Sequence, residues 1–193
     1  MPKPDTAQRI AEAALAILIA EGPKAVTMRR VAADAGVTTM ASYRHFPNRE
    51  TLLRTVADNA FAELGKTWGE RDQLGDFDTR LRANLDDFLD FALTKPNLYT
   101  FLLTDRRDGN RQFPQDFGGD RSPAFAPLLA TVEQGMRDGL LRSDDPLEVT
   151  LAIATTGMGL VDLYLGGRIG MPETEFRALC LRTAERVLNG CRS

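Results

Sequence analysis

The chain has 193 residues, and its 43% hydrophobic and 26% charged residues fit a folded protein of one domain, or of one domain with a small attachment. Its single histidine excludes a multi-histidine metal site, and its two cysteines cannot form a disulfide framework. A formal net charge of -3, taken alone, counts against nucleic-acid binding, because proteins that bind nucleic acid usually present a basic surface.

The apolar segment 13–20 resembles the core of a signal peptide only faintly. The acidic residues Asp5 and Glu12 lie in the stretch before it, and its apolar residues continue a helical period that begins upstream. No stretch of the chain approaches the ~18 uninterrupted apolar residues of a membrane span. With both cysteines taken as reduced thiols, we expect a cytoplasmic protein without a membrane partner.

Three short helices are predicted near the N-terminus. Residues 6–20 place apolar side chains on one stripe, and a Gly-Pro pair follows them. Thr27 and Thr38 are suitable N-cap residues for the second and third helices, which extend to about residues 35 and 45. Gly36 can supply the left-handed residue of the turn between these two helices.

The rest of the chain is also helical in pattern, without convincing strand alternation. A long fourth helix is capped by Asn48 and reaches Trp68. Further helices are expected at residues 76–93, 96–102, 123–139, 146–165 and 172–188. Residues 105–122 are rich in Gly, Asp and Arg and predict a long loop, and the sequence leaves open whether this loop is ordered. The sequence therefore predicts an all-α fold of about nine helices.

The tight turn at Gly36 predicts a helix-turn-helix, in which the third helix enters the major groove of DNA. Val31, Ala32 and Ala35 form a small apolar face that lets the second and third helices approach closely. Hydroxyl, imidazole and cationic groups near the helix ends are candidates for phosphate contacts, namely Thr27, Thr38, Tyr43, His45 and Arg49. Tyr43 could instead be a core aromatic residue, and His45 a structural one.

The candidates for reading bases lie on the third helix. Thr39, Met40 and Arg44 point away from the apolar face, and Thr39 and Met40 are the first choices for base edges. Met40 suits contact with the methyl group of thymine.

Residues 27–53 resemble the DNA-binding motif of the TetR family of transcriptional regulators. The matching positions are Thr27, Ala35-Gly36-Val37, Tyr43, His45-Phe46, Asn48, Arg49 and Leu52-Leu53. Two positions depart from the family pattern. Ser42 stands where the family usually has a branched apolar residue, which would loosen packing under the third helix, and Arg49 stands where Lys is commoner.

The resemblance implies a DNA-binding domain in residues 1–50 and an effector-binding and dimerisation domain in residues 51–193. It implies a homodimer formed by the last two helices, which binds a palindromic operator in double-stranded DNA and is a repressor released by a small-molecule effector. It also places His45 on the DNA backbone and Arg29 at a position that reads a base in some relatives, although a free surface arginine is an equal interpretation of Arg29.

Apolar and aromatic residues of the larger domain could line an effector pocket, although such a stripe is more often core. They are Trp68, Phe88, Phe91, Tyr99, Phe101, Phe125, Met136, Met158 and Tyr164. Asp162 is an acid between Val161 and Leu163 in an otherwise apolar helix. It could be solvated, bond across the dimer or meet a polar group of the effector.

Charge is divided unevenly along the chain. Residues 1–54 hold eight basic and five acidic groups, so the basic surplus lies where the helix-turn-helix lies. An enzyme is not expected, because the sole histidine is in that motif and the acidic pairs 86–87 and 144–145 are adjacent in sequence and do not face one another on a helix. No metal and no cofactor besides the effector are expected. A helical sensor or adaptor without DNA binding remains the alternative, with Ser42 as its only support.

Overall fold

The computed structural model describes residues 5–71, 75–106 and 109–192. Within these ranges the chain forms nine α-helices and three short helical turns, which confirms the predicted all-α fold. Backbone contacts divide the chain into two compact units, Met1–Phe61 with Lys95–Asn110 and Ala62–Thr94 with Arg111–Ser193. The predicted functional boundary after residue 50 stays a prediction.

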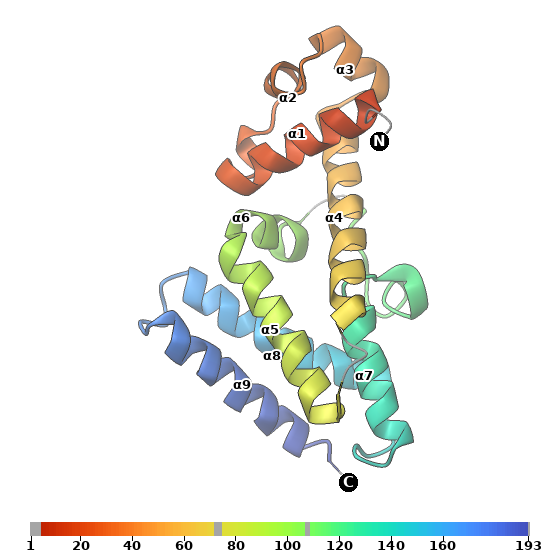
Figure 1. Ribbon diagram of the computed structural model, residues 1–193, viewed down its shortest axis with the longest axis vertical. Coiled ribbons are helices and arrows are strands. Elements are labelled where there is room, and N and C mark those ends of the chain that lie inside the picture. The colour runs from red at the N-terminus through yellow and green to blue at the C-terminus, as the bar shows by residue number, and fades with distance from the viewer. Residues whose placement is uncertain (1–4, 72–74, 107–108, 193) are drawn as a thin grey trace. The chain divides into compact units, whose positions relative to one another are not determined.

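The first unit contains the three predicted N-terminal helices. They are α1 (Thr6–Glu21), α2 (Met28–Asp34) and α3 (Thr39–His45), and the short turn η1 (Pro23–Ala25) joins the first two. α4 (Arg49–Arg71) begins in this unit. α6 (Pro96–Tyr99) packs against α1 and continues into the π-helical turn η2 (Thr100–Thr104). Figure 1 shows α1, α2 and α3 grouped together. Each of these helices has buried residues.

Side chains cap the helices of this unit as predicted. Thr27 Oγ1 accepts a hydrogen bond from the Arg30 amide at 3.3 Å, and Thr38 Oγ1 accepts one from the Ala41 amide at 3.1 Å. Asn48 Oδ1 accepts from the amide of Thr51 at 2.8 Å. Such caps satisfy amides that have no partner within the helix, so they hold the first turns in place.

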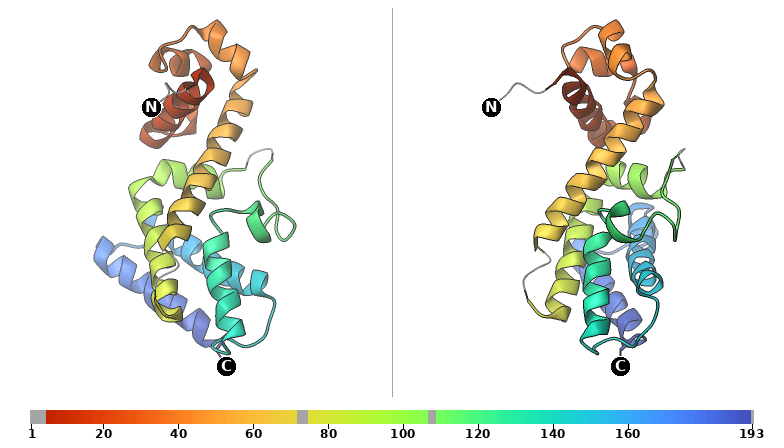
Figure 2. Two further views of the ribbon diagram at one scale, coloured as in Figure 1. Left: turned by 45° about the vertical axis from the view of Figure 1, so that its right-hand side comes forward. Right: turned by 90° about the vertical axis from the view of Figure 1, so that its right-hand side faces the viewer.

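The second unit is a bundle of longer helices. It contains α5 (Phe77–Thr94), α7 (Ala126–Arg137), α8 (Pro146–Leu165) and α9 (Glu173–Asn189), together with the end of α4. In this unit α5 packs against α7, α8 and α9, and α7 also packs against α8. Figure 2 shows these helices in two further views. The core of this bundle includes Leu81, Val132, Leu141, Val149, Ile153 and Leu188.

The described part of the expected loop at residues 105–122 has internal contacts. It includes the short turn η3 (Gly119–Arg121), which the sequence did not predict. Arg111 Nε donates to the carbonyl of Arg121 at 2.7 Å, and the ring of Phe117 meets that of Phe125 edge to face at 5.1 Å between centroids. Backbone acceptors and aromatic side chains thus give this Gly-rich segment a defined path. Residues 107 and 108 lie outside the described residues.

The two free cysteines differ in their surroundings, and we expect them to differ in reactivity. Cys180 on α9 is buried, and burial raises the pKa of its thiol to about 11, whereas Cys191 is partly exposed. The thiolate is the reactive form, so at pH 8 Cys180 should stay protonated and inert. Mass spectrometry after iodoacetamide treatment should find one adduct per native chain and two per unfolded chain. Cys191→Ser should abolish native labelling, and rapid native labelling of that variant would contradict the burial of Cys180.

Candidate functional site

The helix-turn-helix is built from small residues where α2 meets α3. Val31, Ala32 and Ala35 are buried, as the sequence predicts, and Phe46 is also buried. The Val37 amide donates to the carbonyl of Ala32 at 2.9 Å, and Gly36 takes a φ of +65°. That positive φ is costly for residues with a side chain, so Gly36 makes the tight turn possible. The turn therefore sets the direction of α3 relative to α2.

α3 has one buried and one exposed face. Met40 is 75% exposed, Tyr43 is 46% exposed, and Arg44 and His45 are also exposed. Thr39 is partly buried, whereas Thr27, Arg29 and Thr38 are exposed. All the predicted DNA-contacting residues belong to the first unit, on α2, on α3, at the N-caps of these two helices and, for Arg49, at the start of α4.

Ser42 lies on the buried face of α3 and is 0% exposed. Its hydroxyl donates to the carbonyl of Thr39 at 2.7 Å, so the polar group is satisfied within its own helix. The departure from a branched apolar residue therefore leaves no buried hydroxyl without a partner. The alternative of a protein that has lost DNA binding gains no support from this residue.

The arginines of the first unit differ in their partners. Arg30 Nη1 donates to Glu21 Oε2 at 2.8 Å, and this contact holds the pKa of Glu21 below its usual range. Arg9 donates to the carbonyl of Ala35. Within the described ranges of the chain, Arg29 and Arg44 make no hydrogen bond or ion pair. These two arginines therefore present uncompensated positive charge.

Arg49 has a structural role that the sequence did not indicate. Its Nε donates to the carbonyl of Val26 at 2.7 Å, and its Nη2 donates to the carbonyl of Pro23. The side chain thus ties the start of α4 to the segment that precedes α2. Its predicted contact with phosphate stays a prediction, with two of its three nitrogens already engaged.

The predicted effector residues fall in both units. Trp68 and Phe91 lie edge to face in the second unit, with 6.0 Å between ring centroids. Phe125 is buried against Phe117, whereas Tyr99 is fully buried in the first unit. Phe101 is also buried in the first unit. The remaining candidates belong to the second unit, where Phe88 and Met158 are partly buried and Asp162 is exposed on α8.

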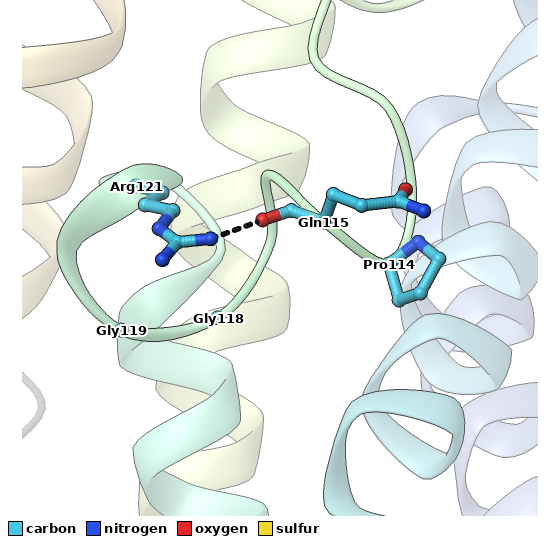
Figure 3. Close-up of a pocket in the computed structure, with 5 residues that line it drawn as sticks. All are labelled: Pro114, Gln115, Gly118, Gly119 and Arg121. Atoms are coloured by element: carbon cyan, nitrogen blue, oxygen red, sulfur yellow. Dashed lines mark hydrogen bonds between the residues drawn. The ribbon is translucent and has the colours of Figure 1, made fainter.

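The second unit has a hollow on its surface. It is lined by Pro114, Gln115, Gly118, Gly119 and Arg121, and none of the predicted effector residues is among them. In Figure 3, Arg121 points across the hollow and donates from Nη1 to the carbonyl of Gln115 at 2.7 Å. Arg121 therefore helps to hold the loop that forms the hollow.

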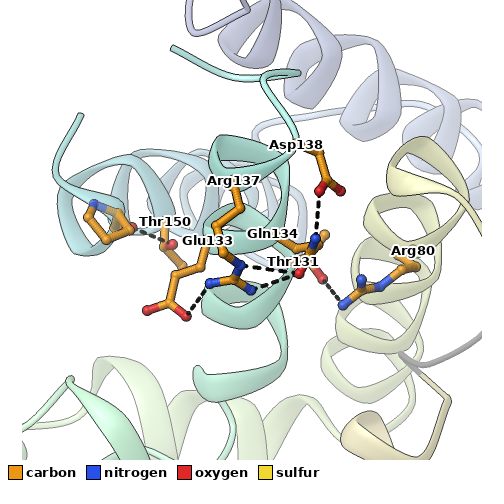
Figure 4. Close-up of polar contacts among 8 residues, drawn as sticks. Arg80, Thr131, Glu133, Gln134, Arg137, Asp138 and Thr150 are labelled. Carbon is orange, nitrogen blue, oxygen red and sulfur yellow. Dashed lines mark hydrogen bonds and ion pairs between the residues drawn. The ribbon is translucent and has the colours of Figure 1, made fainter. Parts of the chain in front are cut away.

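Polar groups inside the second unit are paired with protein groups. Thr131 and Thr150 are 0% exposed, and each donates to a carbonyl of its own helix, those of Pro127 and Pro146. Arg80 also donates to Thr131 Oγ1 at 3.5 Å, which joins α5 to α7 (Figure 4). Among the described residues, no group of three His, Cys, Asp or Glu side chains could hold a metal ion.

Comparisons with known proteins agree with the helix-turn-helix. Residues 10–56 match the family model of bacterial regulatory proteins, tetR family, and residues 81–187 match the tetracyclin repressor-like C-terminal domain. The HTH-type transcriptional repressor DrrR1 of Streptomyces coeruleorubidus is 47% identical over 58 residues. That match covers 30% of this chain and 22% of the relative, so the chain spans about a fifth of that repressor's length.

Solved structures share the fold along nearly the whole chain. A protein of unknown function from Rhodococcus sp. RHA1 has a TM-score of 0.78 at 19% identity, covering 100% of this chain and 98% of that one. FadR from Bacillus subtilis, solved in complex with stearoyl-CoA, has a TM-score of 0.74 at 17% identity, covering 95% and 98%. The C-terminal family model alone covers more than half of the chain. The protein belongs to the TetR family, whose members are DNA-binding transcription regulators and not enzymes.

Proposed function

We propose that this protein is a cytoplasmic, homodimeric repressor that binds a palindromic operator through α3 and is released by a small-molecule effector. The observation that carries the proposal is the set of exposed polar and cationic side chains on α2 and α3. Arg29 on α2 and Arg44 on α3 are exposed without a partner among the described residues, and Tyr43 on α3 is also exposed. A surface of free cations and hydroxyls is what the DNA backbone requires.

The distribution of charge supports this interpretation. The surplus of basic residues in positions 1–54 contrasts with the acidic remainder of the chain. The net charge of -3 is therefore the sum over the whole chain, whereas the proposed DNA-binding part has a surplus of basic residues. Because phosphate contacts release counterions, the binding should weaken steeply as salt rises.

Exposed apolar residues on α8 support a second copy of this chain as a partner. α8 is long and apolar enough to cross a membrane by length and composition, and only 22% of its apolar window is buried. Leu163 is 41% exposed, and Ala152, Thr155 and Gly159 are exposed at helical spacing. Small residues at such spacing let two helices approach closely. α9 packs beside α8, as the predicted dimerisation helices require.

The hydroxyls on α8 are compatible with burial in a dimer. Thr155 Oγ1 donates to the carbonyl of Leu151 at 2.8 Å, and Thr156 Oγ1 donates to that of Ala152 at 2.7 Å. A second chain could cover this face without leaving these donors unpaired, which keeps the cost of burial low. A twofold dimer would present two copies of α3 to the two halves of a palindrome.

For the effector we propose a small molecule that binds in the second unit and changes the affinity for DNA. The Trp68–Phe91 pair and the partly buried Met158 supply apolar surface in that unit. Release of DNA requires only that the effector bind the DNA-free state more tightly than the DNA-bound state. A thermal-shift screen of small molecules, followed by DNA titration with each one that binds, tests this part.

Arg29→Ala and Arg30→Ala form a matched test of the DNA-binding proposal. These residues are adjacent on α2, but Arg30 is already neutralised by Glu21, with which it shares a hydrogen bond, whereas Arg29 is free in the described structure. After operators are selected from random DNA, we expect Arg29→Ala to weaken binding about 10-fold or more and to lower the salt dependence by about one charge per half-site. Arg30→Ala should change affinity less than about threefold.

Filter binding or fluorescence anisotropy at several salt concentrations would measure both variants. Wild-type protein that selects no sequence and shows no salt-sensitive binding, with or without effector, would contradict the proposal and favour the adaptor.

A further inference from the structure

We propose that Met40 and Arg44 determine the sequence of the operator, with Met40 contacting the methyl group of a thymine and Arg44 bonding to O6 and N7 of a guanine. The two bases belong to the same half-site and lie on neighbouring or next-but-one base pairs. This inference rests on the proposed DNA-binding function, and it goes further by assigning bases to individual side chains.

Ser42 fixes which face of α3 is outward. It is 0% exposed, and its position under the helix is set by the packing of α3 onto α2. An α-helix turns about 100° per residue, so residues two positions before and two positions after Ser42 lie about 160° from it. Those residues are Met40 and Arg44. Both therefore project from the face opposite to the packed one, and both are exposed.

Met40 is unusually exposed for an apolar side chain. At 75% exposure it is the most exposed large hydrophobic residue of the described structure. It belongs to a seven-residue helix whose first turn is held by the Thr38 cap, so the side chain is presented from a fixed backbone. Among base edges in the major groove, only thymine offers a methyl group, which an unbranched apolar side chain can cover. Burial of that methyl removes apolar surface of both partners from water.

Arg44 offers the complementary polar contact. It is exposed and makes no hydrogen bond or ion pair in the described part of the chain, so its five N–H donors are available. The planar guanidinium matches the two acceptors of guanine, O6 and N7, which is the commonest specific contact in the major groove. Arg30, in contrast, is held by Glu21 and cannot make this contact without breaking an ion pair.

The spacing of the two side chains limits the spacing of the bases. Residues four apart on a helix have Cβ atoms about 5–6 Å apart. Successive base pairs are separated by about 3.4 Å along the duplex. Two side chains from this face thus reach bases on neighbouring or next-but-one pairs, so the thymine and the guanine should be selected together.

The test uses base analogues that remove one group at a time. The operator is first selected from random DNA with the wild-type protein, and each conserved thymine is then replaced by deoxyuridine, which lacks only the methyl group. Each conserved guanine is replaced by 7-deazaguanine, which lacks the N7 acceptor. Affinities are measured for wild type, Met40→Ala, Arg44→Ala and Leu140→Ala. Leu140 is an exposed leucine of the second unit and serves as a control for losing an exposed apolar side chain.

We expect one thymine per half-site at which deoxyuridine weakens wild type and Leu140→Ala about fourfold but leaves Met40→Ala unchanged. We expect one guanine, within two base pairs of it, at which 7-deazaguanine weakens wild type at least about fivefold and leaves Arg44→Ala unchanged. If wild type binds its operator yet no analogue distinguishes the variants from wild type, the assignment of bases is wrong and the proposed function stands. If wild type selects no operator, the proposed function itself is wrong.

Discussion

A folded monomer that has lost its affinity for the operator is the expected result of Gly159→Arg. Gly159 is exposed on α8, and a Cβ atom added there meets nothing within 4 Å in its own chain. The arginine therefore fits the isolated chain, but it places a charge in the proposed interface of both subunits. Burying such a charge without a partner costs about 3 kcal/mol or more, which is a factor of at least ~100 in the dimer dissociation constant.

Loss of the dimer should lower operator affinity by a similar factor, because one subunit binds only one half of a palindrome. Analytical ultracentrifugation and DNA titration at the same protein concentration measure the two effects. Gly69→Arg is the matched control, since Gly69 is also a helical glycine of the second unit whose added Cβ meets nothing within 4 Å. We expect Gly69→Arg to remain dimeric and to bind DNA as wild type does.

If the Gly159→Arg protein stays dimeric at the same concentration as the wild-type protein, this face of α8 is not the interface. Association of the wild-type protein with lipid vesicles, without self-association in solution, would instead favour a membrane as the partner of the apolar surface on α8.

Gly65→Ala should destabilise the second unit, although alanine is usually preferred to glycine inside a helix. A Cβ atom at position 65 would lie 2.6 Å from the backbone of Pro123, a distance that forces either α4 or the segment before α7 to move. Backbone cannot rotate away as a side-chain end can, so we expect a loss of about 1–3 kcal/mol in the free energy of unfolding.

The control for this prediction is Gly69→Ala, one turn further along the same helix. The space beside Gly69 is open, so alanine there should add up to about 1 kcal/mol through helix propensity alone. Urea denaturation followed by circular dichroism would measure both variants. Equal stabilisation by the two substitutions would mean that Gly65 is not in close contact with Pro123.

Local sequence features were sufficient to predict the helices of the first unit. Thr27, Thr38 and Asn48 are residue types that favour N-caps, and in the structure their side chains accept hydrogen bonds from amides three residues later. Gly36 was identified because only glycine adopts a positive φ at little cost. These interactions span a few residues, so the order of amino acids specifies them directly. The short turn η3 was missed, since the Gly-rich segment around it has no helical period.

The functions of individual side chains depended on groups far away in the sequence. Arg49 binds carbonyls 23 and 26 residues before it, and Arg30 binds an acid nine residues before it. No local pattern separates these arginines from Arg29, which looks the same in the sequence but is free in the described structure. Tyr99 is of the aromatic type expected in an effector pocket, yet it is buried in the first unit.

The sequence by itself therefore determined the family, the helical architecture and the position of the helix-turn-helix. Capping, hydrophobic period and glycine turns are local, and they suffice for those features. Only the tertiary structure decided which arginines of the helix-turn-helix have no partner in the described part of the chain, because hydrogen bonds and ion pairs form between atoms that folding alone brings within reach.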